Sequence, residues 1–439
     1  MKRSASPGVS PPPLKRKVES TTTKAAVASF FTPVSQKKPE KITWRIVNKS
    51  LVVGKYDNKS TATSEQTTTR REEVTGKKRK IAAFDLDSTL ITTASGNRFA
   101  RNARDWKWWH GSVPDRLREL TDKGYQVVVI SNQKKISLKN ELKGGQSESK
   151  SLSNFKEMTT AVMRQLDIPL SIYAATQYDD YRKPRTGMWK EFLDDHDLDI
   201  DDRVDLEGSV FVGDAAGRPG DHSCVDRDFA ANVGIPFKTP EEFFLNASPE
   251  QVIREFDPAK FIQEEPDSAA VPTFSKLHPQ ELVLFCGSPG AGKSTFYWRY
   301  LQPQGYKRIN QDILKSRANC IKAAREHLQK GSSVAIDNTN PSLDVRKEWT
   351  DLARSFKIPA RCVHFTAPAA LCRHNDAVRA ANPCLNPEHR PPLPGMAFAD
   401  FQRRYQEPKL EEGFEDITRV DFVFRGTEEE KAIWKKFWI

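Results

Sequence analysis

The sequence contains no long apolar run. No stretch of its 439 residues approaches the roughly 18 consecutive apolar residues of a membrane-spanning helix. Residues 1–7 (MKRSASP) also lack the apolar core of a secretory signal. We therefore expect an intracellular protein with no membrane segment.

Cysteine is scarce and scattered. No two of the six cysteines form a Cys-x-x-Cys pair, and the eight histidines form no ligand pair with them. This spacing excludes a disulfide framework and an ordinary zinc site, and it predicts free thiols.

Net charge is nearly absent from most of the chain. Residues 1–80 hold 19 of the 69 Lys and Arg but only 6 of the 58 Asp and Glu, which leaves 50 basic and 52 acidic residues for 81–439. A basic excess usually indicates an acidic partner such as nucleic acid. Here that argument applies only to the N-terminal fifth.

This N-terminal segment has a composition typical of disorder. Residues 1–80 contain 20 Ser and Thr, six Pro and four aromatic residues, too little apolar surface to offset the entropy of ordering. We predict a disordered basic tail over 1–79, in which residues 41–56 either pair as a short ribbon or dock on the catalytic body. The clusters 13–17 and 77–80 indicate nuclear import, with a solvated charge run as the alternative.

From Lys80 onward, short apolar runs alternate with amphipathic stretches. The runs Ile81–Phe84, Val127–Ile130 and Val210–Val212 form one series, and a second series begins at Leu282–Phe285. This alternation is typical of parallel sheets with crossover helices. We predict two doubly wound α/β domains, over 80–247 and 280–439, joined by a proline-containing linker over 248–279.

Two aspartates directly follow the first apolar run. Asp85 and Asp87 are two residues apart, so an extended backbone directs both side chains to one side at a strand end, where ligands bind in open parallel sheets. Two adjacent carboxylates repel each other unless a cation is bound. With Mg²⁺ present, one aspartate attacks a phosphorus and the other supplies a proton. A pair of solvated turn residues is the alternative.

Three further features accompany this pair. Ser131 and Asn132 end a second apolar run, Lys183 offers a cation, and Asp214 ends a third run. The set resembles the four motifs of the haloacid dehalogenase phosphatases.

That resemblance implies a role for each residue. Asp85 would form an aspartyl-phosphate, and Asp87 would act as general acid and then activate water. Ser131, Asn132 and Lys183 would hold the phosphoryl group. Asp214 would complete the Mg²⁺ site with Asp85 and the carbonyl of Asp87.

Three further segments indicate the class of substrate. Residues 181–189, 213–219 and 240–245 are similar to the phosphatase half of polynucleotide kinase 3′-phosphatases. The short interval between Asp87 and Ser131 leaves no room for a large cap domain, so the site would admit a polymer end. Within the similar region, we expect Asp221, Asp226 and Arg227 to brace Lys183 or line the opening.

Cations and aromatic residues interleave after the first site. Such interleaving suits single-stranded nucleic acid, because bases stack on rings and cations follow phosphates. Core packing of the tryptophans is the alternative. The candidate DNA-contact residues are Arg98, Arg101, Arg104, Trp106, Trp108 and Trp109, with Lys315 from the second domain.

A phosphate-binding loop opens the second domain. Residues 287–294 fit G-x-x-x-x-G-K-[ST] after an apolar run, so backbone N–H groups, Lys293 and a Mg²⁺ held by Ser294 would bind ATP. The candidate ATP-binding residues of the loop are Gly287, Ser288, Pro289, Gly290, Ala291, Gly292, Lys293, Ser294 and Thr295.

Later residues separate a kinase from an ATPase. Asp312 ends another short run and is placed to accept a proton from an attacking hydroxyl, while a helix cap is the alternative. Together with Asp337 and a basic segment after Cys372, it resembles the 5′-hydroxyl polynucleotide kinases. The resemblance implies Arg373 and Arg379 as lid arginines. Lys315 stands where several relatives have Arg, which puts anchoring of the neighbouring phosphate in doubt.

Together the two resemblances imply a nuclear DNA end-processing enzyme that uses Mg²⁺ and ATP, acts as a monomer, and converts 3′-phosphate and 5′-hydroxyl ends into ligatable ones. An RNA end-healing enzyme and a scaffold with inactive sites are the alternatives. Residues 24–31 resemble the sliding-clamp-binding peptide through Phe30 and Phe31, although Lys24 occupies its usual Gln position. Residues 1–79 are too few and too polar for the forkhead-associated domain of some relatives.

Overall fold

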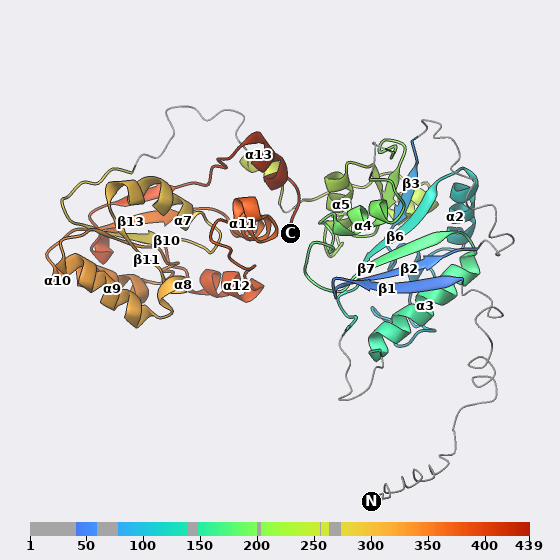
Figure 1. Ribbon diagram of the computed structural model, residues 1–439, viewed down its shortest axis with the longest axis horizontal. Helices are drawn as coiled ribbons and strands as arrows, with labels where there is room; N and C mark the ends of the chain where they lie inside the picture. Colours follow the sequence, from blue (N-terminus) through green and yellow to red (C-terminus); the bar gives the residue numbers. More distant parts are fainter. Residues whose placement is uncertain (1–40, 59–77, 139–147, 200–202, 255, 263–273) are drawn as a thin grey trace, which may run out of the picture.

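The protein was analysed as a computed structural model that describes residues 41–58, 78–138, 148–199, 203–254, 256–262 and 274–439. Its elements form two bodies (Figure 1). The predicted fold class, two α/β domains built on parallel sheets, is confirmed. No helix in these ranges combines the length and the apolarity needed to cross a bilayer.

The first body contains strands β1 (Ile42–Val47), β2 (Leu51–Tyr56), β3 (Ile81–Phe84), β4 (Ile91–Thr92), β5 (Lys107–Trp108), β6 (Gln126–Asn132), β7 (Leu170–Ala175), β8 (Val210–Val212) and β9 (Phe237–Lys238), and helices α2 (Val113–Asp122), α3 (Lys150–Leu166), α4 (Gly187–Asp194), α5 (Val225–Val233) and α6 (Pro240–Phe244). In the described residues, its main sheet has seven strands in the order β1-β2-β7-β6-β3-β8-β9. The strands from β7 to β9 in this order are parallel, whereas β1 and β2 are antiparallel to their neighbours.

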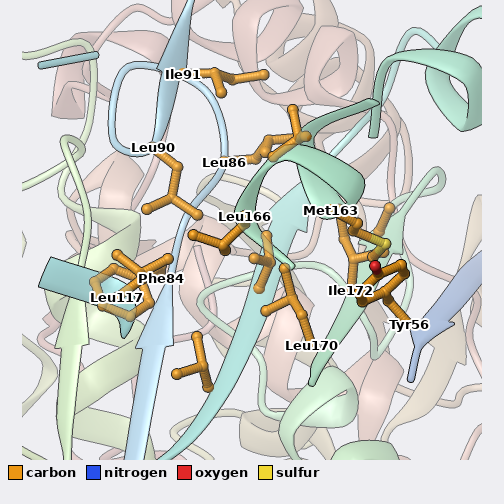
Figure 2. Packing of buried hydrophobic residues seen from close by; sticks show 14 of the residues in the cluster. Tyr56, Phe84, Leu86, Leu90, Ile91, Leu117, Met163, Leu166, Leu170 and Ile172 are labelled. Carbon is orange, nitrogen blue, oxygen red and sulfur yellow. The ribbon is translucent and has the colours of Figure 1, made fainter. Parts of the chain in front are cut away.

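Helices cover both faces of this sheet. Phe84 of β3 packs with Leu117 of α2 and Leu166 of α3 on one face (Figure 2). Its neighbour Ala83 points to the other face, where it belongs to a cluster with residues of α4 and α5. Because both faces are buried, β3 is apolar throughout, as is typical of a central parallel strand. The polar residues that follow such strands are therefore gathered at one edge of the sheet.

Residues 42–56 pair as a ribbon and dock on the first body, as expected, and they extend that body beyond the predicted boundary at residue 80. They form a hairpin in which Ile42 pairs with Tyr56 and Val47 with Leu51, and β2 then pairs with β7. Three residues connect the two strands, and two of them, Asn48 and Lys49, have positive φ, which turns the chain tightly. The basic, polar composition of 1–79 obscured a strand, β2, that is almost entirely buried. The tail prediction for 1–40 and 59–77 lies outside the described residues.

The second body contains strands β10 (Leu282–Cys286), β11 (Lys307–Ile309), β12 (Val334–Ile336), β13 (Ala360–Phe365) and β14 (Ile417–Val420), and helices α7 (Lys293–Phe296), α8 (Gln311–Leu314), α9 (Arg317–Gln329), α10 (Leu343–Ser355), α11 (Ala369–Ala381), α12 (Gly395–Arg404) and α13 (Glu428–Trp434). In the described residues the sheet has five strands, all parallel, in the order β11-β12-β10-β13-β14. Residues of α9 and α10 pack on one face, and residues of α7 and the following turn pack on the other.

The segment predicted as a linker packs against both bodies. Arg254 pairs with Asp228 of α5, whereas Phe274 lies in the core of the second body. The chain end returns to the first body (Figure 1), where Asn232 Nδ2 donates to the carbonyl of Phe437 at 2.7 Å. The prolines of this segment suggested a linker, although some of its apolar residues, such as Phe274, pack in a core.

Candidate active sites

The first site lies where β3, β6 and β8 end. Asp85 directly follows β3, and its backbone N–H donates to the carbonyl of Val212 at 2.9 Å, which extends the pairing of β3 with β8. Ser131 and Asn132 close β6, and Asp214 lies two residues beyond β8. Parallel strands end at the same edge, so residues that are far apart in the chain meet there.

Lys183 connects the carboxylates of this site. Its Nζ lies 2.8 Å from Oδ1 of Asp85 and 2.7 Å from Oδ1 of Asp226, and all three residues are buried. Burial alone would lower the pKa of Lys183, but the charges of Asp226 and Asp85 outweigh it and raise that pKa. Asn132 fixes the Lys183 backbone, with its Nδ2 3.1 Å from the carbonyl and its Oδ1 2.9 Å from the N–H.

The expectation that Asp226 braces Lys183 is confirmed, and Gly213 makes room for it. A Cβ at position 213 would lie 2.4 Å from the Asp226 carboxylate. Asp221 and Arg227 instead hold the loop after β8, since Asp221 accepts from the Ala216 N–H and Arg227 donates to the Ala216 carbonyl.

Three carboxylates of the site could hold a metal ion. One oxygen from each of Asp85, Asp214 and Asp226 lies within 4.8 Å of the others. Burial and the charges of Asp85 and Asp226 raise the pKa of Asp214, because three acidic groups face one lysine. Carboxylate oxygens are the ligands that Mg²⁺ prefers, so the donor set fits that ion. Of these three carboxylates, Asp226 was not predicted from the sequence as a metal ligand.

Asp87 stands at the mouth of the site. Gln133 Nε2 donates to its Oδ2 at 2.6 Å and to Ser131 Oγ at 3.1 Å, which ties Asp87 to the end of β6. The surrounding protein and the Asp85 carboxylate raise the pKa of Asp87, although its side chain remains open to solvent. Gln133 received no role from the sequence, and its place directly after Asn132 was the available signal.

The second site is built on the turn between β10 and α7. Gly290 and Gly292 have positive φ, and a Cβ at 290 would lie 2.2 Å from the carbonyl of Cys372. The loop therefore needs glycine both for its backbone and for its packing. Lys293 is buried and donates to the carbonyls of Gly287 and Ser288 at 2.9 and 2.6 Å, and burial lowers its pKa.

A cavity of about 690 Å³ extends from this loop. Its lining includes the predicted site residues Lys293, Ser294, Asp312 and Lys315, and it also includes Phe424. Asp312 is the second residue of helix α8, whose N-cap Asn310 accepts from the Asp312 N–H at 3.0 Å. Lys315 Nζ donates to the Asp312 carbonyl at 2.8 Å.

Of the two predicted lid arginines, the structure places Arg379 in the cavity and leaves Arg373 outside its lining. The two are six residues apart on α11, which is not a whole number of helical turns, so they face different directions. Arg390 also lines the cavity. Its Nη1 lies 3.6 Å from Asp312 Oδ2, and its Nη2 donates to Ser294 Oγ at 3.2 Å. The proline-rich sequence around Arg390 did not indicate that this residue belongs to the site.

The predicted DNA-contact residues divide into two groups. Trp106, Trp108 and Trp109 are half-buried and pack against the first core, as the alternative reading held. The arginines remain exposed (Arg98, Arg101 and Arg104). Phe99 is also exposed, with the Lys135 ammonium over its ring.

Comparison with known proteins follows the division into two bodies. The family model described as polynucleotide kinase 3 phosphatase matches residues 80–244, and an AAA domain model matches 282–320 and 316–408. A bifunctional polynucleotide phosphatase/kinase of Schizosaccharomyces pombe is 42% identical over 353 residues, covering 79% of this chain and 80% of the relative. A protein of the same description from Acanthamoeba polyphaga mimivirus is 31% identical over 385 residues, covering 81% and 88%.

Among solved structures, a haloacid dehalogenase-like phosphatase from Mesorhizobium loti is 15% identical with a TM-score of 0.30, covering 44% of this chain and 80% of that one. The two sequence relatives span both bodies, and the predicted resemblance is confirmed. The chain belongs to the family of bifunctional polynucleotide phosphatase/kinases.

Proposed function

We propose that this chain hydrolyses 3′-phosphate ends of DNA at the first site and transfers the γ-phosphate of ATP to 5′-hydroxyl ends at the second. The observation that carries the proposal is the presence, in one chain, of two separate constellations for phosphoryl transfer. One is Asp85 with Lys183, and the other is the loop at Lys293 with Asp312 in the same cavity. Membership of the bifunctional family supports it.

At the first site, the Asp85 carboxylate attacks phosphorus and forms an aspartyl-phosphate while the bond to the 3′ oxygen breaks. Asp87 gives its proton to that oxygen, and then removes a proton from the water that hydrolyses the aspartyl-phosphate. Lys183 and the end of β6, at Ser131 and Asn132, bind the phosphoryl oxygens. Mg²⁺ bound by Asp85 and Asp214, with the Asp87 carbonyl, would offset the phosphate charge. Asp226 keeps Lys183 charged and in place.

At the second site, the backbone of the Gly287–Ser294 loop and Lys293 bind the phosphates of ATP. Asp312 accepts the proton of the 5′-hydroxyl as that oxygen attacks the γ-phosphorus. Arg379 and Arg390 offset charge on the transferred group, and Lys315 anchors the acceptor strand. Ser294 is the residue that would hold Mg²⁺, whose charge helps to neutralise the phosphates.

The remaining functional predictions concern the N-terminal segment and the assembly. We propose a nuclear monomer whose basic clusters direct import and whose Phe30 and Phe31 bind a sliding clamp. Residues 1–40, which include both phenylalanines and the first basic cluster, lie outside the described residues.

A nicked duplex with a labelled 3′-phosphate and a 5′-hydroxyl tests the two activities together. Incubation without ATP should release phosphate from the 3′ end, and phosphorylation of the 5′ end should require ATP. Matched RNA ends complete the design, and faster turnover on RNA at both sites would replace the DNA assignment with the RNA alternative. A chain with neither activity on either polymer would support the scaffold alternative.

A further inference from the structure

The hydroxyl of Ser294 has its hydrogen-bonding capacity filled by side chains of the second site. Its Oγ donates to Asp337 Oδ2 at 2.9 Å and accepts from Arg308 Nη2 at 2.9 Å and Arg390 Nη2 at 3.2 Å. A serine hydroxyl offers one donor and two acceptor positions. A cation that binds Ser294 Oγ must therefore displace at least one guanidinium.

Arg308 makes the more extensive of the two guanidinium contacts. Its Nη2 lies 2.6 Å from Asp337 Oδ2, its Nε donates to the same oxygen at 2.7 Å, and its Nη1 lies 2.7 Å from Glu388 Oε1. The guanidinium is nearly buried and lies 5.0 Å from the centroid of the Trp298 ring. One positive charge thus bridges the two oxygens, of Ser294 and Asp337, that are disposed to hold a metal ion.

The strands keep Arg308 in this position. Arg308 lies on β11, paired in register with Ala335 of β12, and Asp337 directly follows β12. The Asp337 N–H donates to the Ile309 carbonyl at 2.8 Å, and Asn310 Nδ2 donates to the Asp337 carbonyl at 2.7 Å. The placement of Arg308 opposite Asp337 is therefore set by backbone pairing and not by a flexible loop.

The two sites differ in local charge. At the first, three carboxylates face Lys183. At the second, Asp337, Glu388 and the more exposed Asp312 face Arg308 and Arg390, with Lys293 buried nearby. Charges interact strongly in partly buried sites. The carboxylates of the first site therefore attract a bare divalent cation, whereas the arginines and the lysine of the second site repel one. The phosphates of a nucleotide would reverse the balance at the second site.

We propose that Arg308 excludes bare divalent cations from the kinase site, so that the metal binds there only together with a nucleotide. Arg308 is a positioning residue that acts through Ser294 and Asp337. The inference rests on the proposed kinase function of this site. A purely structural Arg308 would instead hold the segment around Glu388 and leave metal affinity unchanged.

Mn²⁺ titration of the full chain, with free ion measured by electron paramagnetic resonance, tests this exclusion. Wild-type protein should bind one Mn²⁺ without nucleotide, at the first site, and a second when ADP is added. Two Mn²⁺ bound by wild type without nucleotide would overturn the proposal, whatever the variants do.

Arg308→Met should bind the second Mn²⁺ without ADP. Its affinity for that ion in the absence of ADP should exceed the wild-type affinity by on the order of tenfold or more. Arg299→Met is the matched control, because Arg299 lines the same cavity and its guanidinium lies over the ring of Tyr300. Repeating both in an Asp214→Asn chain removes a carboxylate of the first site and isolates the second. An Arg308→Met chain with wild-type circular dichroism and no second site would overturn the proposal.

This measurement is independent of turnover. A chain that phosphorylates 5′-hydroxyl ends but binds two bare Mn²⁺ refutes the role of Arg308 and leaves the kinase assignment intact. A chain that shows nucleotide-dependent Mn²⁺ binding but no phosphorylation refutes the kinase assignment alone.

Discussion

The Nζ of Lys183 lies 2.8 Å from Oδ1 of Asp85, although the two residues are 98 positions apart in the chain. Both are buried at the end of β3. A lysine in such a position keeps its charge only because carboxylates surround it, and here their effect raises its pKa despite burial. The same ammonium is thus positioned to meet a phosphoryl group in the hydrolysis proposed for Asp85.

Replacing Lys183 by Met should lower the rate of 3′-phosphate hydrolysis by about 10²–10³, the usual cost of losing one aligned electrostatic donor. It should also lower the free energy of unfolding of the first body by about 3–5 kcal/mol, because Asp85 and Asp226 lose their buried partner. Steady-state phosphatase assays and urea unfolding measure the two effects. Lys190→Met on the exposed face of α4 is the control, and an unchanged hydrolysis rate in Lys183→Met would contradict the assignment.

Lys293→Ala should abolish 5′ phosphorylation and leave hydrolysis of 3′-phosphate at the wild-type rate. The reason is that Lys293 lies in a loop of the second body, and the first site is built from β3, β6 and β8 of the other. Asp85→Ala should have the reverse effect. Rates of both reactions on one doubly labelled oligonucleotide provide the measurement. Simultaneous loss of both activities in a folded variant would show that the two sites are not independent.

Gly213→Ala tests how closely Asp226 is held. The new Cβ would lie 2.4 Å from the Asp226 carboxylate, so Asp226 must move and Lys183 must follow. Crowding of this kind costs typically about 1–3 kcal/mol of stability, and we expect phosphatase activity to fall with it. Gly111→Ala has no atom within 4 Å of its Cβ and is the control. Equal hydrolysis rates and melting temperatures for the two variants would argue against the tight fit.

Motifs confined to a few consecutive residues were predictable from the sequence. Asp85 directly follows an apolar strand, and Lys293 and Ser294 end the glycine-rich loop that follows another; strand ends of parallel sheets gather ligands. Arg390 was not predictable, because it reaches Ser294 across 96 residues through a segment without periodicity. Which of Arg373 and Arg379 lines the cavity was also not predictable, because a basic cluster on a helix does not reveal which of its members faces it.

For residues 42–56 the sequence indicated either a short ribbon or docking on the catalytic body, and the structure shows both. The predicted boundary of the first domain still left them out, because composition averaged over 1–80 is polar and hides the six residues of β2. For the tryptophans after the first site the sequence left two interpretations open, since an aromatic residue between arginines suits both base stacking and a core, and Trp106 packs against the core. Only the three-dimensional neighbours of the tryptophans show whether they pack in a core or remain available for base stacking.

Two N-terminal truncations should therefore behave differently. Deleting residues 1–40 should leave both rates on a short oligonucleotide nearly unchanged, because it keeps β1, which begins at Ile42, and every residue of both sites. Deleting 1–57 also removes β1 and β2, which exposes the edge of β7 and loses buried side chains such as Leu51 and Val52. Each such side chain contributes about 1.5–3 kcal/mol. Thermal melting and phosphatase rates measure the contrast, and equal stability of the two truncations would contradict the role given to the hairpin.

His374 makes the stability of the second body dependent on pH. It is buried against the rings of Phe256 and Trp434, its Nε2 lies 2.8 Å from the Trp434 carbonyl, and burial lowers its pKa to about 4. A base whose pKa is depressed by folding is neutral in both states above its ordinary value of 6.5. As pH falls from 6.5 to 4, the unfolded chain takes up a proton first, so stability is lost across that window.

The loss should reach about 3 kcal/mol at pH 4 relative to a chain without this group. His374→Gln retains a hydrogen-bond donor toward the Trp434 carbonyl and removes the titration, so its free energy of unfolding should fall less steeply between pH 6.5 and 4. Urea unfolding followed by tryptophan fluorescence at steps of pH measures the difference. His222→Gln, at an exposed position, should keep the wild-type slope. If His374→Gln also keeps the wild-type slope, the acid sensitivity belongs to other groups, and His374 has no measurable part in it.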